Sequence, residues 1–435
     1  MRGLVLGALR PTQPSLHAAT DHASPPECRP GRAGTRSVVD QALRSLLRRR
    51  FRRAPLRFSL ADGTDLFDSG IDRVATVLAQ DRHTLLGLVV DPEGNFGDAY
   101  GEGRIDVRGG DLVAALEAAY RALDSGGNEG RPRALGWGHS LRESRANARR
   151  HYDLGNEFYR LWLDEQMIYT SAYFPRPGLS LEQAQVAKLD RVCRKLVLQP
   201  GERVVEAGCG WGALALHMAR RCGVAVRAYN VSAEQVRYAR ARAVAEGLSG
   251  LVEFVEDDYR SITGRFDAFV SVGMLEHVGP ENYRRLGSVI RRCLDPERGR
   301  GLLHFIGRDR ARRVNAWIRK RIFPGAYSPT LAEVAGEVLE PAGLSALDVE
   351  NLRPHYAATL AHWRARFEAA ADAVRARYGA EFTRAWRLYL AGSEAAFRTG
   401  SLQLFQVVFA RGGADVPWSR AGVDVEGAEV TSRRP

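Results

Sequence analysis

Arg203-Val-Val-Glu-Ala-Gly-Cys-Gly-Trp-Gly212 is the stretch of sequence that decides the fold of this chain. Val204 and Val205 form a short apolar run, which is typical of a buried parallel strand. The three glycines that follow let the backbone turn sharply and approach a ligand closely, which a Cβ atom would hinder. The segment from Ala213 to Arg220 then has helical periodicity. A glycine turn between a strand and a helix predicts a Rossmann-like α/β fold with a nucleotide-type binding site.

An acidic residue, Glu206, precedes the first glycine by two positions and narrows the kind of site. A dinucleotide site would carry the spacing Gly-x-Gly-x-x-Gly and bind a pyrophosphate. The spacing Glu-x-Gly-x-Gly-x-Gly instead resembles motif I of the S-adenosylmethionine-dependent methyltransferases. This resemblance assigns cofactor binding to the strand end and the turn, at Glu206, Ala207, Gly208, Gly210 and Gly212.

Strands and helices alternate along the chain from Glu202 to Gly307. Apolar runs predict four further strands, at Val224–Tyr229, Leu251–Val255, Phe266–Val272 and Gly301–Ile306. Ligands of open α/β sheets bind outside the carboxyl ends of the strands. The polar residues at these ends are therefore the next candidates for the site.

Polar residues follow the second and third of these strands. Asn230 stands where many cofactor enzymes carry an acid for the ribose hydroxyls, so we expect Asn230 and Gln235 to make that contact. Ser232 is a candidate helix cap, and Gln235 three residues later completes the pattern of a capping box, which adds Ser232 to the cofactor-binding set. Asp258 and Tyr259 follow the third strand and are well placed to contact adenine.

Two residues capable of acid–base chemistry lie at the last two strands. Glu276 follows the fourth strand, and His304 lies in the fifth. Both therefore belong to the edge of the sheet where chemistry is expected. His277, beside Glu276, is interpreted as a structural histidine.

The charge of the chain indicates anionic partners. The formal net charge is +12, and arginine supplies nearly all of the positive side chains, because the only lysines are Lys188, Lys195 and Lys320. A basic protein of this kind favours either nucleic acid or a phospholipid surface.

The cysteines and the hydropathy indicate the compartment. Five cysteines are scattered without Cys-x-x-Cys spacing, which supports neither a disulfide framework nor a metal site. We therefore expect a reducing, cytoplasmic environment. No run approaches the roughly 20 apolar residues of a membrane span, and the apolar stretch Met1–Leu9 is too short for one.

Composition divides the chain into five parts. Residues 1–36 are predicted to be a disordered tail, 37–124 a small α+β domain, 125–139 a linker, 140–411 the main domain and 412–435 a second tail. In the small domain we expect two strands, at Leu56–Leu60 and Ile105–Val107. We also expect three helices, from about Val38 to Arg53, at Thr84–Val90 and at Leu112–Leu123.

Several blocks of sequence, in one order, resemble the cyclopropane-fatty-acyl-phospholipid synthase family, whose relatives include the mycolic acid cyclopropane synthases. The resemblance extends over roughly Phe51 to Arg411. The blocks are His151-Tyr-Asp-Leu-Gly155, Tyr169-Thr-Ser-Ala-Tyr-Phe174, Glu206–Gly212, Gly273-Met-Leu-Glu-His-Val-Gly-Pro280, Leu302-Leu-His-Phe-Ile-Gly307, Trp317-Ile-x-Lys-x-Ile-Phe-Pro324, and Phe397-Arg with Gln403-Leu-x-Gln-Val-Val-Phe409.

The resemblance implies transfer of a methylene group from S-adenosylmethionine to the cis double bond of an acyl chain of a phospholipid. The reaction passes through a carbocation, so the pocket should be apolar and closed, with aromatic faces near the cation. Tyr152, Tyr169, Tyr173 and Phe174 are candidates for these faces, with core packing as the alternative for the last two. Tyr152, Tyr169 and Thr170 also join the implied cofactor-binding set.

The family uses a bound bicarbonate ion as the base that closes the ring. Carried over by position, the residues around the ion would be Glu276, His304, Tyr356, Ser171 and the backbone of Ile306. A carboxylate accepts from the OH group of the ion, whereas His304, Tyr356 and backbone N–H groups donate to its other oxygens.

Two positions depart from the family pattern. Ser171 replaces a cysteine beside the ion, and its hydroxyl and backbone N–H can still form hydrogen bonds. Ser393 stands where a second cysteine was proposed as a nucleophile in the family. Covalent catalysis by cysteine is therefore not expected, and Ser393 is interpreted as a packing residue.

Other functions remain open at this point. The same fold and first step could yield a methylene or methyl branch instead of a ring. A small-amine N-methyltransferase would leave the segment Phe51–Leu123 without a purpose. A lipid carrier or a nucleic-acid-binding module would leave Glu276, His304 and the glycine turn unexplained.

We expect the partner to be an anionic membrane surface, bound peripherally at the cytoplasmic face, rather than nucleic acid, and a homodimer is possible. Charge for docking could come from Arg48–Arg53 or from the basic residues between Arg308 and Arg321. In the second cluster, Trp317, Ile318, Ile322 and Phe323 interleave with the basic residues, which favours insertion into a bilayer. The alternative is that these apolar residues face the core.

Overall fold

The computed structural model describes residues 38–124, 154–416, 418 and 420 of the 435 residues. The proposed tail 1–36 and linker 125–139, most of the proposed tail 412–435, and Tyr152 lie outside the described residues. The chain divides into two compact units, and Ala370–Leu388 belongs to the same unit as the N-terminal part up to Leu123. In the part that is described, no helix has the length and apolar character needed to cross a membrane.

The N-terminal unit contains a four-stranded sheet in the order β2-β1-β3-β4. Strand β1 pairs antiparallel with β2 and parallel with β3, and β3 pairs antiparallel with β4. One apolar core joins the helices to this sheet. Its elements before the linker are α1 (Val38–Phe51), β1 (Leu56–Leu60), β2 (Asp65–Asp68), β3 (Ala75–Ala79), α2 (Arg82–Val90), α3 (Pro92–Gly101), β4 (Ile105–Arg108) and α4 (Leu112–Asp124).

Sequence reasoning found most of these elements but missed three of them. Strands β2 and β3 and helix α3 were not predicted, because β2 has only four residues and α3 contains Pro92 and three glycines, which do not favour a helix. Pro92 lies in the first turn of α3, where its missing N–H costs no hydrogen bond, and Asp91 accepts from the Gly94 amide as a cap. The α+β character of this unit is confirmed.

A distant segment of the chain completes the N-terminal unit. It consists of α14 (Ala371–Tyr378) and the first half of α15 (Ala380–Thr399). Arg384 of α15 lies over the ring of Tyr100 at 4.3 Å, and its guanidinium donates to the carbonyl oxygens of Tyr100 and Ile105. The sequence placed Ala370–Leu388 within the main domain 140–411, whereas its contacts, between residues almost 300 positions apart, group it with the N-terminal unit.

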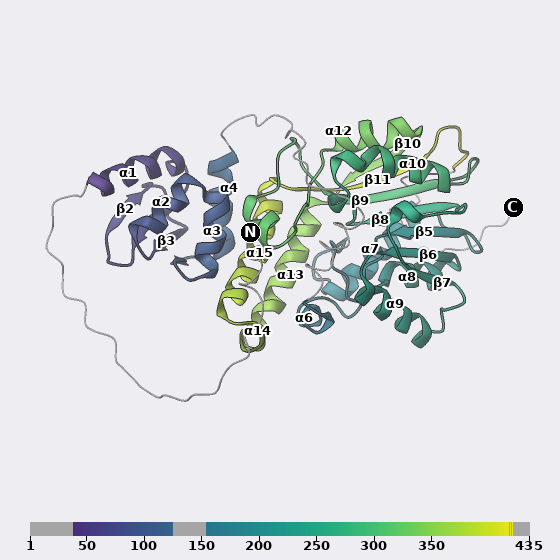
Figure 1. Ribbon diagram of the computed structural model, residues 1–435, viewed down its shortest axis with the longest axis horizontal. Helices are drawn as coiled ribbons and strands as arrows, with labels where there is room; N and C mark the ends of the chain where they lie inside the picture. The colour runs from purple at the N-terminus through teal and green to yellow at the C-terminus, as the bar shows by residue number, and fades with distance from the viewer. Residues whose placement is uncertain (1–37, 125–153, 417, 419, 421–435) are drawn as a thin grey trace, which may run out of the picture. The chain divides into compact units, whose positions relative to one another are not determined.

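The second unit is organised around a seven-stranded sheet in the order β10-β11-β9-β8-β5-β6-β7 (Figure 1). Its helices and strands, with the second half of α15, are α6 (Asn156–Arg160), α7 (Leu181–Lys195), β5 (Arg203–Ala207), α8 (Ala213–Cys222), β6 (Ala225–Asn230), α9 (Ala233–Ala245), β7 (Val252–Glu256), η2 (Tyr259–Ser261), β8 (Ala268–Val272), η3 (Leu275–His277), η4 (Pro280–Asn282), α10 (Tyr283–Cys293), β9 (Arg300–Gly307), α11 (Ala316–Arg321), α12 (Leu331–Val334), η5 (Ala335–Leu339), η6 (Glu340–Ala342), β10 (Leu344–Asn351), α13 (Arg353–Ala369) and β11 (Gln403–Arg411).

Strands β5 to β9 are mutually parallel, as the alternating sequence predicts. The Rossmann-like fold with a small α+β unit before it is confirmed. Strands β10 and β11 were not predicted. They add two antiparallel strands, with β11 between β10 and β9, so that Gln406 of β11 lies directly opposite His304 of β9.

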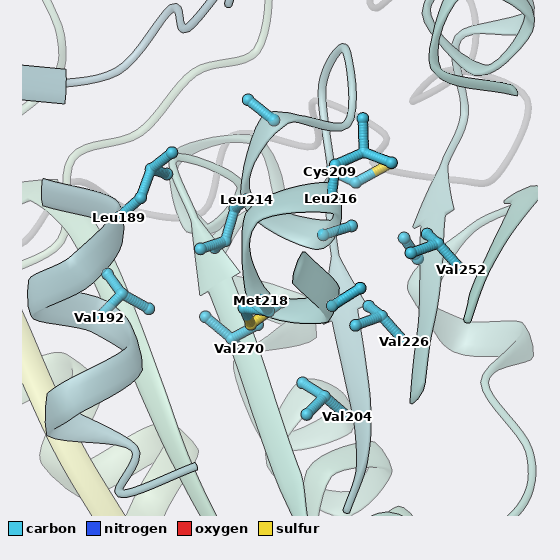
Figure 2. Close-up of a cluster of buried hydrophobic side chains, with 14 of the residues drawn as sticks. Leu189, Val192, Val204, Cys209, Leu214, Leu216, Met218, Val226, Val252 and Val270 are labelled. Carbon is cyan, nitrogen blue, oxygen red and sulfur yellow. The ribbon is translucent and has the colours of Figure 1, made fainter. Parts of the chain in front are cut away.

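Both faces of this sheet are buried. Consecutive residues of β5 point to opposite faces, so Val204 joins one apolar cluster and Val205 the other. On the first face the side chains of α7 and α8 pack on the valines of four strands, as Figure 2 shows for Leu189, Val192, Leu214 and Met218. Helix α10 and the η5 turn cover the second face. Burial on both faces explains why the strands are continuous apolar runs.

The segment around α11 does not present the apolar face expected for membrane insertion. Trp317 and Ile322 are both 5% exposed, and they therefore pack inside the protein. Asn315 caps the helix by accepting from the amides of Trp317 and Ile318. The prediction that these apolar side chains enter a bilayer was wrong for Trp317 and Ile322, because the interleaved pattern reflects the two sides of a short surface helix.

Candidate active site

The glycine turn joins β5 to α8, and its glycines serve different purposes. Gly210 has a φ of +53°, and a Cβ atom added there would meet no atom within 4 Å, so the backbone borders open space. A Cβ atom on Gly212 would lie 2.7 Å from Phe254 and 2.8 Å from Ala239. Gly212 therefore allows the helix to pack closely on the sheet, whereas Gly210 is available to a ligand.

A pocket lies beside this turn, at the carboxyl ends of β5, β6, β7 and β8. Nine residues predicted to bind the cofactor line it: Tyr169, Thr170, Glu206, Gly208, Gly210, Asn230, Gln235, Asp258 and Tyr259. Three others, Ala207, Gly212 and Ser232, do not line the pocket. The structure thus gathers most of the predicted cofactor residues around one cavity.

Asn230 and Gln235 form a hydrogen-bonded pair on the pocket wall. The Asn230 amide donates to Gln235 Oε1 at 2.8 Å and to the Gly210 carbonyl oxygen at 3.1 Å. Ser232 caps α9, because its Oγ accepts from the Gln235 amide, but the expected capping box is wrong. The Gln235 side chain binds Asn230 instead of closing the box, and its Nε2 has no partner among the described residues.

Asp258 and Tyr259 also line the pocket. Asp258 is the cap of η2 and accepts from the Arg260 amide at 2.9 Å. Its carboxylate is therefore partly engaged within the protein. The hydroxyl of Tyr259 has no partner among the described residues, and burial raises the pKa of Tyr259.

Lys188 of α7 is a pocket residue that sequence reasoning missed. Its ammonium lies 3.2 Å from the Thr170 hydroxyl, and the side chain is almost fully buried beside Glu206. Burial raises the pKa of Glu206 and lowers the pKa of Lys188, and the charge of each partly offsets the effect on the other. Its spacing could have revealed it. Lys188 lies three residues after Gln185 and four before Val192, so it belongs to the buried face of α7.

Glu276 does not line the pocket, although Met274 before it and His277 after it do. Strand β8 has ended at this point, so the Ile306 amide of β9 is left without a strand partner on that side and donates to Glu276 Oε1 at 2.6 Å. Oε2 has no partner among the described residues. Burial raises the pKa of Glu276 to about 7.

His304 lies two residues before Ile306 on the same strand. Its Nδ1 is 2.9 Å from the Gln406 amide nitrogen, and its Nε2 has no partner in the described part of the chain. Burial, with the nearby charges of Lys188 and Lys195, lowers the pKa of His304 to about 3. The imidazole is therefore neutral at physiological pH.

The other three residues predicted to surround the ion occupy different environments. The Ile306 amide donates to Glu276, so it serves the carboxylate rather than a separate ion. The Ser171 hydroxyl donates to the Ala172 carbonyl oxygen at 2.9 Å. Tyr356 of α13 packs on Phe397 and Trp363, with ring centroids 4.5 and 5.9 Å apart. The structure thus joins Glu276 to Ile306, two residues after His304 on β9, and it places Ser171 and Tyr356 in packed surroundings.

An aromatic cluster surrounds Tyr169 at the pocket. The rings of Tyr159, Trp162 and Trp363 lie 5.2 to 5.5 Å from that of Tyr169. The Tyr169 hydroxyl also forms a hydrogen bond with that of Tyr389. His277, which the sequence analysis interpreted as a structural histidine, lines the pocket and packs against Phe323. The wall therefore combines aromatic faces with buried carboxylates.

The parallel sheet order, the glycine turn after β5 and the acid at Glu206 together define a class of protein. That class is the S-adenosylmethionine-dependent methyltransferases of class I.

Comparison with known proteins narrows the class. Residues 139–407 match the family model described as mycolic acid cyclopropane synthetase. The chain is 37% identical over 380 residues to a probable fatty acid methyltransferase of Pseudomonas putida, covering 84% of this chain and 95% of the relative. It is 43% identical over 263 residues to the cyclopropane-fatty-acyl-phospholipid synthase of Escherichia coli K12, and this match covers 60% of this chain and 67% of the relative.

A solved structure agrees with these matches. Mycolic acid cyclopropane synthase CmaA1, complexed with SAH and CTAB, has a TM-score of 0.58 and 30% identity, and the match covers 61% of this chain and 98% of that chain. The chain belongs to the mycolic acid cyclopropane synthetase family. The resemblance inferred from the sequence blocks is confirmed, and so is an enzyme of the S-adenosylmethionine-dependent methyltransferase type.

Proposed function

We propose that this enzyme transfers a methylene group from S-adenosylmethionine to the cis double bond of unsaturated acyl chains of phospholipids, forming a cyclopropane ring. The alkene attacks the methyl carbon, the bond from that carbon to sulfur breaks, and a carbocation forms on the acyl chain. Loss of one proton from the transferred methyl group supplies the electrons that close the ring. The products are the cyclopropane, the thioether and a proton.

The pocket residues are suited to the methyl donor. Gly210 leaves room for a ligand against the backbone, and the unpartnered Gln235 Nε2 and Glu206 Oε2 offer a donor and an acceptor. An ammonium or a hydroxyl of the donor can satisfy Glu206 Oε2, the oxygen of this carboxyl group that is buried without a hydrogen-bond partner among the described residues. The aromatic cluster around Tyr169 excludes water from a reacting cation.

One observation carries the proposal for the base. Glu276 Oε2 and His304 Nε2 are buried and have no partner among the described residues. Glu276 accepts from the amide of Ile306, which lies two residues after His304 on β9. Bicarbonate fits such a pair, because its OH donates to a carboxylate and its oxygens accept from an imidazole N–H. When bound there, the ion would supply the base for the methyl proton. Lone polar atoms buried in this way carry a desolvation cost that a ligand relieves.

Expression in a bacterial strain that lacks its own cyclopropane synthase tests the function. Gas chromatography with mass spectrometry of the phospholipid fatty acids should reveal ring-containing chains, and the Glu276→Gln variant should lose them. Purified wild-type enzyme should also lose activity in buffer freed of bicarbonate and recover it when bicarbonate is added. A methylene or methyl branch in place of the ring would contradict the proposed product, and full activity without bicarbonate would contradict the base.

We also propose that the enzyme reaches its substrate by docking on an anionic membrane surface. Support comes from exposed arginines in both units, Arg48 and Arg49 on α1 and Arg310 and Arg313 before α11. Because Trp317 and Ile322 are buried, charge rather than apolar insertion would dominate the docking of this second group.

A further inference from the structure

Gln406 is a fully buried side chain next to the proposed ion site. It lies on β11 directly opposite His304 of β9, in the part of the sheet that runs antiparallel. Its amide nitrogen is 2.9 Å from His304 Nδ1, so the two side chains meet across neighbouring strands on one face. The sequence marks this residue only as one position of the block Gln403–Phe409.

This contact determines which nitrogen of His304 carries the proton. A neutral imidazole has one N–H donor and one acceptor nitrogen. When the Gln406 amide donates to Nδ1, that nitrogen must be the acceptor, and the proton must reside on Nε2. Nε2 is the nitrogen without a partner among the described residues. The surroundings keep the ring neutral, because burial lowers the pKa of His304 far below neutrality.

We propose that Gln406 is a positioning residue that fixes the proton of His304 on Nε2 and holds the ring so that this N–H is presented to the bound anion. The inference rests on the proposed function, because the anion is the one assigned there to Glu276 and His304. It specifies the chemistry of that site further. Glu276 accepts and His304 donates, so the site selects an oxyanion that carries both an OH group and a bare oxygen.

A purely structural role for Gln406 makes a different prediction. If the side chain only fills space between β9 and β11, a methionine of similar length should preserve the site, and the position of the imidazole proton should not depend on residue 406. If Gln406 sets the proton, its replacement should weaken use of the anion without affecting the cofactor pocket, which Gln406 does not line.

The direct test is the ¹⁵N NMR spectrum of the full-length protein labelled at histidine, with the His304 signals assigned by their absence in His304→Asn. We expect an Nε2–H imidazole with an unprotonated Nδ1 in the wild type, from about pH 6 to pH 8. An Nδ1–H imidazole in the wild type would overturn the inference. This measurement needs no activity, and its result on the wild type does not depend on whether Gln406→Met folds well.

Kinetics of Gln406→Met supply the second measurement. We expect the bicarbonate concentration for half-maximal activity to rise about tenfold or more, the scale on which partners of a ligand-binding histidine act. The affinity for S-adenosylmethionine should stay near the wild-type value. Gln403→Met is the matched control, because Gln403 lies on the same strand but its amide donates to Asp309 and to a backbone carbonyl.

The outcomes separate the two proposals. An unchanged bicarbonate dependence in Gln406→Met, or an equal rise in Gln403→Met, would overturn the role of Gln406. If the wild-type enzyme shows no bicarbonate dependence at all, the proposed base fails instead. The NMR spectrum then remains the test of whether Gln406 sets the proton of His304.

Discussion

At the scale of single residues, burial gives the active-site groups their properties. Burial raises the pKa of Glu276 and lowers that of His304, because in both groups it disfavours the charged form. A carboxylate without enough partners gains protons more readily, and an imidazole without partners loses them. A ligand that supplies one donor and one acceptor satisfies both, which is why these two residues are the centre of the proposed chemistry.

The stability of the protein should depend on the protonation of Glu276. Its pKa rises from 4.5 to about 7 on folding, so the folded state binds this proton more tightly than the unfolded chain does. The stabilising contribution is therefore full below about pH 4.5 and is lost as the pH rises through about 7. At about 1.4 kcal/mol for each pKa unit, ionisation should cost the folded state about 3 kcal/mol by about pH 8.

Urea unfolding of the wild type and Glu276→Gln measures this cost. In bicarbonate-free buffer, the free energy of unfolding of the wild type should fall more between about pH 5 and pH 8 than that of the variant. The comparison between the two proteins removes the contributions of other groups such as Glu206. Parallel pH profiles for the two proteins would show that Glu276 is not the buried acid described above.

Gly210 and Gly212 should respond differently to substitution. Gly210→Val should reduce the affinity for S-adenosylmethionine about a hundredfold or more, because the side chain would enter the open space beside the turn. Gly212→Ala should instead lower stability by about 1–3 kcal/mol, because its Cβ atom would overlap Phe254 and Ala239. Calorimetric titration and thermal unfolding separate the two effects. Normal cofactor affinity in a folded Gly210→Val protein would remove this turn from the site.

At the scale of elements, the strands and helices around the glycine turn could be predicted from local sequence patterns, but contacts between distant residues could not. The strands β5 to β9 follow from apolar runs, because burial on both faces leaves few polar residues in them. Strands β10 and β11 were missed, since β11 pairs with β9 about 100 residues before it, and β10 joins the sheet only through β11. The capping box at Gln235 failed because Asn230 offered that side chain a competing hydrogen bond.

Lys188 and Gln406 illustrate the same limit for the site. Lys188 appears in the sequence as a polar residue on a helix and Gln406 as one position of the block Gln403–Phe409, and nothing local says which side chain each one faces. Their importance follows only from the contacts with Thr170 and His304. The positions of Glu276 and His304 after β8 and in β9 could be predicted, because the carboxyl ends of parallel strands meet at one edge of the sheet, and their catalytic role stays a prediction.

Helix α7, which carries Lys188 to the pocket, begins with a capping box. Ser180 accepts from the Gln183 amide, and the Gln183 side chain accepts from the Ser180 amide. Ser180→Ala should therefore lower the free energy of unfolding by about 1 kcal/mol. Ser288→Ala, an exposed serine inside α10, serves as the control and should change stability little. An equal loss for both variants, measured by urea unfolding, would argue against the cap.

At the scale of the whole molecule, the two compact units do not follow the order of the chain. The N-terminal unit includes Ala370–Leu388, so the boundary of the methyltransferase part cannot be set by a single position in the sequence. Composition alone gave the N-terminal boundary near residue 124. It could not assign α14, because helical periodicity does not say which core a helix joins.

Docking on membranes should depend on the exposed arginines before α11. Replacing Arg310 and Arg313 by glutamine should weaken binding to anionic vesicles roughly thirtyfold at low salt, at about 1 kcal/mol for each charge near the surface. The control replaces the exposed Arg221 and Arg237 of α8 and α9 by glutamine, which changes the net charge equally. Co-sedimentation measures both. Equal weakening by the two variants would mean that net charge, rather than this surface, controls docking.

The most direct test of the central claim follows the hydrogens of the transferred methyl group. Purified enzyme is incubated with vesicles of a cis-unsaturated phospholipid, bicarbonate and S-adenosylmethionine that carries a fully deuterated methyl group. Mass spectrometry and NMR of the released fatty acids should reveal a cyclopropane whose bridging carbon retains two of the three deuterium atoms, because one is lost to the base. A methyl branch that retains all three, an exocyclic methylene group, or unchanged lipid would contradict the account.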